Sequence, residues 1–77
     1  MDHSARLELE LEIAQTERAL VEIRREIQIM IDDPDADLSR LMRKNAQRTE
    51  MEAYYKGLTF TARIMDASRR GAENSSH

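Results

Sequence analysis

Residues 7–30 read LELELEIAQTERALVEIRREIQIM, and the spacing of the apolar residues in this stretch decides the fold. Starting at Leu9, alternating steps of four and three residues form a row in which all positions but one are apolar. Its members are Leu9, Ile13, Thr16, Leu20, Ile23, Ile27 and Met30. Such a heptad row keeps one stripe of an α-helix facing a partner helix. The sequence therefore predicts a helix over about residues 4–31.

A second apolar row lies beside the first, at Leu7, Leu11, Ala14 and Val21. Together the two rows are wider than the contact that a single partner helix covers in a two-stranded coiled coil. We therefore expect part of this helix to face another protein chain.

The predicted helix is followed by the acidic segment Asp32-Asp33-Pro34-Asp35-Ala36-Asp37. Pro34 disfavours helical geometry at Asp33 and suits the first position of a new helix, so Asp33 is the expected N-cap of that helix. Four aspartates within six residues also suggest a calcium-binding loop. However, the EF-hand pattern requires a central glycine and a distal glutamate at fixed spacing, and both are missing here. Capping is the preferred interpretation, and no metal site is expected.

A second helix is predicted over about residues 34–70, ending in basic residues before Gly71 as its C-terminal stop. The first row of helix 4–31 and the start of helix 34–70 are expected to form the core of the hairpin. The predicted core residues are Leu9, Ile13, Leu20, Ile23, Ile27, Met30, Leu38 and Met42. Residues 72–77 are small and polar, and we expect them to be disordered.

These features predict an all-α fold: residues 1–71 form one antiparallel two-helix hairpin. Residues 1–37 carry eleven acids and four bases, a charge of −7, whereas residues 38–77 carry four acids and eight bases, a charge of +4. The two halves should therefore attract each other, although salt screens such exposed pairs. A chain of 77 residues has only a thin core, and small scaffolds of this kind commonly gain stability by association.

The apolar residues beyond this core are the candidates for partner binding. Tyr54 and Tyr55 point about 100° apart on a helix, so one of them should lie on a second surface, where aromatic residues with a polar group are favoured. The predicted partner-binding residues are Leu7, Leu11, Val21, Tyr54, Tyr55, Leu58 and Phe60.

Nothing in the sequence predicts catalysis, and we expect neither an enzyme nor a cofactor site. The chain has no cysteine and no phosphate-binding glycine loop, and His3 and His77 lie at its ends without metal ligands at helical spacing. No apolar run is long enough to span a bilayer, no targeting segment is recognisable, and a cytosolic location fits best.

Two alternative roles remain open. Arg40, Arg43, Lys44 and Arg48 occupy successive turns, and a dimeric helical hairpin could bind RNA or DNA through such a face. The net charge of −3 and the acids of the first helix make nucleic acid the weaker hypothesis. The other alternative is a structural coiled-coil adaptor.

The chain resembles the small E-type co-chaperones of bacterial type III secretion systems. The resemblance lies in Leu20 to Asp37 and Leu38 to Met65, notably in Asp33-Pro34 and Tyr54-Tyr55. It implies a hairpin that joins a second, helical-repeat chaperone in the bacterial cytosol. Together they would hold the needle subunit and prevent its polymerisation before export. It also implies that the isolated chain can form a homodimer.

Overall fold

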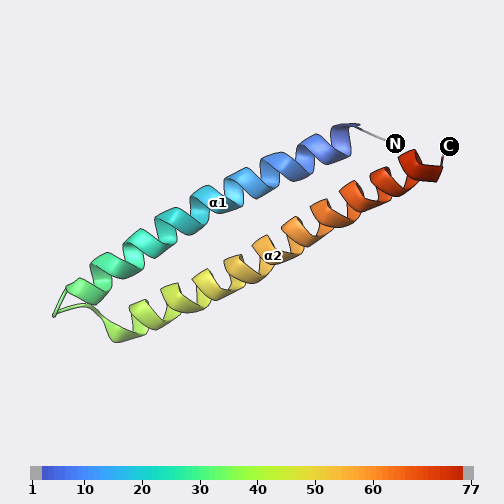
Figure 1. The fold of residues 1–77 in the computed structure, drawn as a ribbon. Helices are drawn as coiled ribbons and strands as arrows, with labels where there is room; N and C mark the ends of the chain where they lie inside the picture. The colour runs from blue at the N-terminus through green and yellow to red at the C-terminus, as the bar shows by residue number, and fades with distance from the viewer. Residues whose placement is uncertain (1–2, 76–77) are drawn as a thin grey trace.

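The computed structural model describes residues 3–75, and the side chains of residues 4–71. It contains two helices, α1 (His3–Asp32) and α2 (Leu38–Ser75), joined by residues 33–37. Figure 1 shows the helices running antiparallel, with the turn at one end of the molecule and the helix termini at the other. The result is a rod of 65 × 16 × 15 Å. The prediction of an all-α antiparallel hairpin is confirmed.

The heptad row that begins at Leu9 faces α2, and we call it the inner face of α1. The matching row of α2, its inner face, also advances by alternating steps of three and four residues. Every member of this second row is half-buried: Leu41, Lys44, Arg48, Met51, Tyr55, Leu58, Ala62 and Met65. The cations Lys44 and Arg48 occupy two of these positions, and this is why the row does not stand out in the sequence as an apolar stripe.

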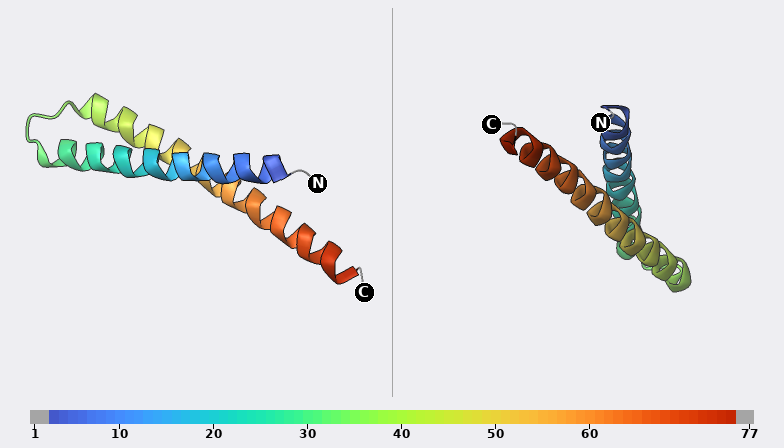
Figure 2. Two further views of the ribbon diagram at one scale, coloured as in Figure 1. Left: turned by 90° about the horizontal axis from the view of Figure 1, so that it is seen from above. Right: turned by 90° about the vertical axis from the view of Figure 1, so that its right-hand side faces the viewer.

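The core of the hairpin is small and lies in its middle. Leu20, Ile23 and Ile27 are buried, and Leu41, Met51 and Tyr55 pack against them. Figure 2 shows that the helices are skewed and cross near the middle of α2, so they separate towards their ends. The outer members of the predicted core, Leu9, Ile13 and Met30, are accordingly only half-buried.

Leu38 and Met42 were predicted to lie in the core, but they are 67% and 64% exposed. The residue that turns towards α1 in this part of α2 is Leu41, and Lys44 follows it on the same face. Because successive helical residues are rotated by about 100°, Met42 points away from that face. Two cations at the next inner positions concealed this rotation in the sequence.

The turn also differs from the prediction, because Asp33 does not cap α2. The backbone N–H of Ala36 donates to the carbonyl oxygen of Asp33 (3.2 Å), and that of Asp35 donates to Oδ1 of Asp33 (2.9 Å). Asp33 and Pro34 thus open a β-turn, with proline at the position that such turns favour. The N-cap is Asp37, whose Oδ1 accepts a hydrogen bond from the N–H of Ser39 (3.0 Å). Helix α2 therefore starts at Leu38 rather than at Pro34.

Replacing the capping residue, Asp37→Ala, is expected to lower the free energy of unfolding by about 1 kcal/mol, because the N–H of Ser39 then loses its acceptor. Thermal unfolding followed by circular dichroism measures this loss. Asp35→Ala is the matched control, because the contact recorded for Asp35 uses its backbone N–H rather than its carboxylate. An equal loss in both variants would show that the total acidic charge near the helix start matters, not the cap.

The C-terminal end of α2 lies further along the chain than predicted. No glycine in the described residues has a positive φ, so Gly71 does not adopt the left-handed conformation of a helix stop. The helix continues to Ser75 and includes residues 72–75, which were predicted to be disordered. Residues 76–77 of the predicted tail lie outside the described residues. With 38 residues against 30 in α1, α2 extends past the start of its partner.

Candidate protein-interaction surfaces

Many of the large apolar side chains in the described residues are not covered by the hairpin. Three are buried, whereas ten are more than half exposed: Leu7, Leu11, Val21, Ile29, Ile31, Leu38, Met42, Tyr54, Phe60 and Ile64. Isolated exposed apolar residues are ordinary on a protein surface, but rows of them mark binding sites. Five of these residues lie on two surfaces, one on each helix, four lie near the turn, and Tyr54 lies beside the contact between the helices.

The first surface is the outer face of α1, formed by Leu7, Leu11, Ala14 and Val21. It lies on the side of α1 that is turned away from α2, and its three larger side chains are between 54% and 63% exposed. All three were predicted as partner-binding residues, and the structure places them together on one accessible face.

The second surface is the outer face of α2, of which only Phe60 was among the predicted partner-binding residues. Phe60 and Ile64 are exposed one turn apart. They belong to a row of steps of four and three residues on the side of α2 away from α1: Ala53, Gly57, Phe60, Ile64, Ala67 and Gly71. The regular spacing of this row is present in the sequence. It does not stand out as an apolar stripe, because four of its six members are alanine or glycine. Near the turn, Ile29, Ile31, Leu38 and Met42 are also exposed, but Ile29 and Ile31 are two residues apart and so lie on different sides of α1.

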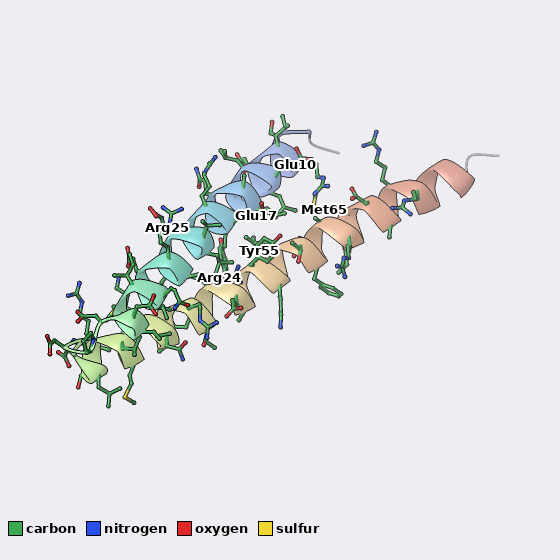
Figure 3. All side chains as sticks on the ribbon, turned by 60° about the vertical axis from the view of Figure 1, so that its left-hand side comes forward. Glu10, Glu17, Arg24, Arg25, Tyr55 and Met65 are labelled. Carbon is green, nitrogen blue, oxygen red and sulfur yellow. The ribbon has the colours of Figure 1, made fainter. Side chains whose placement is uncertain are left out.

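Tyr55 lies in the contact between the helices, whereas Tyr54 lies beside it. Tyr55 packs against the core and donates its hydroxyl hydrogen to Oε1 of Glu17 (2.8 Å), whereas Tyr54 is exposed and donates to Oε1 of Glu12 (3.1 Å). Figure 3 shows Tyr55 between the helices, near Glu17. The expectation that one of the pair lies outside the core thus applies to Tyr54. Tyr55 and half-buried Leu58, also predicted to bind a partner, lie on the inner face of α2.

A shallow groove runs beside the contact between the helices, on the side where Tyr54 lies. Its walls come from both helices, and its lining residues are Glu12, Gln15, Thr16, Ala19, Met51 and Tyr54. The small side chain of Ala19 leaves this space open. An apolar side chain from another protein could enter it, whereas no set of convergent polar groups is present to bind a small polar ligand.

Each tyrosine hydroxyl bonds to a carboxylate, and these bonds raise the pKa of Tyr54 and Tyr55 above the ordinary value of 10.0. Because the folded pKa is raised, this stabilisation is present below the unfolded pKa and is lost as the pH rises through the folded pKa.

We expect tyrosinate absorbance to appear at a higher pH than in the unfolded chain. The chain has two tyrosines and no tryptophan, so the signal is specific. Glu17→Gln should return the pKa of Tyr55 towards its ordinary value, and Glu12→Gln that of Tyr54. If both tyrosines of the wild-type chain titrated as they do in the unfolded chain, the hydrogen bonds to Glu17 and Glu12 would be contradicted.

Half of the predicted basic cluster forms ion pairs: the pair of Lys44 joins the two helices, whereas the pair of Arg48 lies within α2. Lys44 pairs with Glu26, and Nη1 of Arg48 lies 3.6 Å from Oε1 of Glu52, which also meets Arg24 across the helices. The hydrogen bond and charge of Lys44 lower the pKa of Glu26. Because Lys44 and Arg48 lie on the inner face of α2, the four predicted bases do not form one exposed face.

The described residues hold no group of three or more histidine and acidic side chains arranged to bind a metal ion. Among them, no helix combines the length and the apolar character needed to cross a membrane. In comparisons with known proteins, the chain matches no protein-family model, no curated protein and no solved structure.

Proposed function

We propose that this chain is a protein-binding hairpin that acts as a co-chaperone. In this proposal it stabilises a helical-repeat chaperone and helps to keep a type III secretion needle subunit soluble in the bacterial cytoplasm before export. One observation carries the protein-binding part: among the described residues, ten large apolar side chains are exposed, on both helices, whereas three are buried. The specific co-chaperone role is supported by the resemblance stated above.

The geometry favours a protein partner over nucleic acid. Exposed apolar rows on two helices suit the docking of amphipathic helices, which is the surface that a helical-repeat protein provides. Binding to a nucleic-acid backbone would instead use a continuous basic face. Here, Lys44 and Arg48 are occupied by Glu26 and Glu52.

Co-purification of the tagged chain from its native host, after nuclease treatment, tests the proposal. We expect recovery of both a helical-repeat protein and a short needle-like subunit. Phe60→Glu, on the outer face of α2, and Leu7→Glu, on the outer face of α1, should each reduce that recovery while leaving helicity unchanged. Recovery of salt-sensitive nucleic acid without protein would support the nucleic-acid alternative. Recovery of an unrelated structural protein would support the adaptor alternative and contradict the co-chaperone role.

A further inference from the structure

The outer face of α2 combines a bulky centre with small ends. Phe60 and Ile64 form the centre, while alanine and glycine occupy the row on both sides of them. Small residues at regular helical spacing allow another helix to approach the backbone closely, and the two bulky residues then fill the space between the helices.

Gly57 has no role in the packing of the hairpin itself. A Cβ atom added at this position would meet nothing within 4 Å, and no glycine in the described residues has a positive φ. Neither neighbouring side chains nor backbone conformation therefore requires glycine in the middle of a long helix, where it weakens the helix relative to alanine. Close approach of a second helix is a physical reason for it.

The charges beside the outer face of α2 are basic. Lys56 and Arg63 directly precede Gly57 and Ile64, and neither makes an ion pair within the described residues. Residues 53–71 carry four bases and one acid, a formal charge of +3. A helix that docks here should bring an apolar row bordered by acids.

The outer face of α1 has these properties. Its apolar residues, Leu7, Leu11, Ala14 and Val21, share this face with Arg18, and the face is bordered on one side by Glu8 and Glu22 and on the other by Glu10 and Glu17. Residues 4–22 carry five acids and two bases, a formal charge of −3. Within one hairpin, the inner face of α1 packs antiparallel against α2. The outer face of α1 could pack against another α2 helix in the same antiparallel way.

We propose that the outer face of α2 binds the outer face of α1 in a second copy of this chain. Within one hairpin these faces point in opposite directions, since each is turned away from the contact between the helices. The contact between copies is therefore heterologous, and each copy keeps one unused face of each kind at the ends of the assembly. This predicts an open, head-to-tail series of hairpins rather than a closed pair. The inference does not depend on the co-chaperone role.

Analytical ultracentrifugation of the full chain, up to about 1 mM where weak specific contacts become populated, tests this inference. We expect the average mass to rise continuously from 9.0 kDa through species larger than a dimer, and to rise less at high salt. A single species of 9.0 kDa at all concentrations, or a limit at the dimer, would overturn the proposal.

Two variants that each block one face distinguish this arrangement from others. Leu11→Glu and Phe60→Glu should each be monomeric alone, because neither offers both faces. Mixed in equal amounts, they should form a heterodimer and nothing larger. Met42→Glu, at an equally exposed residue near the turn, is the control and should associate like the wild-type chain. Association of Leu11→Glu alone would indicate contact between two α2 faces and contradict the proposal.

Gly57→Leu separates folding from association. The added side chain enters open space within one hairpin, so the helix should become more stable, yet it obstructs the close approach of a second helix. We expect a higher unfolding temperature at low concentration together with weaker self-association. Self-association that is unchanged or stronger in this variant would overturn the proposed contact. Failure to capture a chaperone from the host, by contrast, bears on the proposed function alone.

Discussion

Leu20→Ala is expected to lower the free energy of unfolding by about 3 kcal/mol, the range found for leucine to alanine changes at buried sites. Leu20 is only 4% exposed, and it is one of three large apolar residues buried in the described part of the chain. Native domains of this size are marginally stable, so this loss removes most of the margin. We expect the variant to be largely unfolded at 37 °C.

Thermal unfolding by circular dichroism, at a low protein concentration where copies do not associate, measures this effect. Leu38→Ala is the matched control, because it removes the same atoms from a side chain that is 67% exposed. It should change the free energy of unfolding by less than about 0.5 kcal/mol. Equal losses in the two variants would mean that Leu38 contributes to the core after all.

Arg48→Met is expected to have the opposite effect and to raise the free energy of unfolding by about 1–2 kcal/mol. Arg48 occupies the inner face of α2, where its Nε atom is buried without a hydrogen-bond partner. A buried unsatisfied donor costs free energy, and the ion pair with Glu52 is half-exposed, so it offsets little of that cost. Methionine would continue the apolar contact from Met51 towards Leu41.

The unfolding temperature should rise by about 4–16 °C, since 1 kcal/mol corresponds to about 4–8 °C in a domain of this size. Arg25→Met is the control, because the Arg25 side chain is 67% exposed and lies outside the contact between the helices. Its expected change is close to zero. A lower unfolding temperature in Arg48→Met would show that the pairs of Arg48 with Glu52 and Asn45 outweigh the buried Nε atom.

The sequence was sufficient to predict α1 and its packing face. The predicted helix over residues 4–31 differs from the observed His3–Asp32 by one residue at each end. Leu20, Ile23 and Ile27, the centre of the predicted row, are the buried apolar residues of the described part of the chain. Apolar side chains occupy nearly every inner position there, so the helical period is evident without knowledge of the partner helix.

The side of α2 that faces α1 could not be predicted from the sequence in the same way. Lys44 and Arg48 hold inner positions through their long aliphatic stems, with their charged ends reaching Glu26 and Glu52. A polar residue that packs with its stem looks like a surface residue in the sequence. Leu38 and Met42 were consequently assigned to the core, and Tyr55 and Leu58 to a partner surface. In the structure, Leu38 and Met42 are exposed, whereas Tyr55 and Leu58 lie half-buried on the inner face of α2.

Local sequence alone determined that this chain forms two long helices joined near Asp33-Pro34, because heptad spacing, helix propensity and proline geometry act within a few residues. Only the tertiary structure decided which side of α2 faces α1 and where α2 begins and ends. It also decided which apolar residues stay uncovered. The physical reason is that burial depends on how the two helices are rotated and how they cross. Both depend on contacts between residues that are far apart in the sequence. A skewed pair of helices can cover only the residues near its crossing point, and the remaining apolar rows stay exposed.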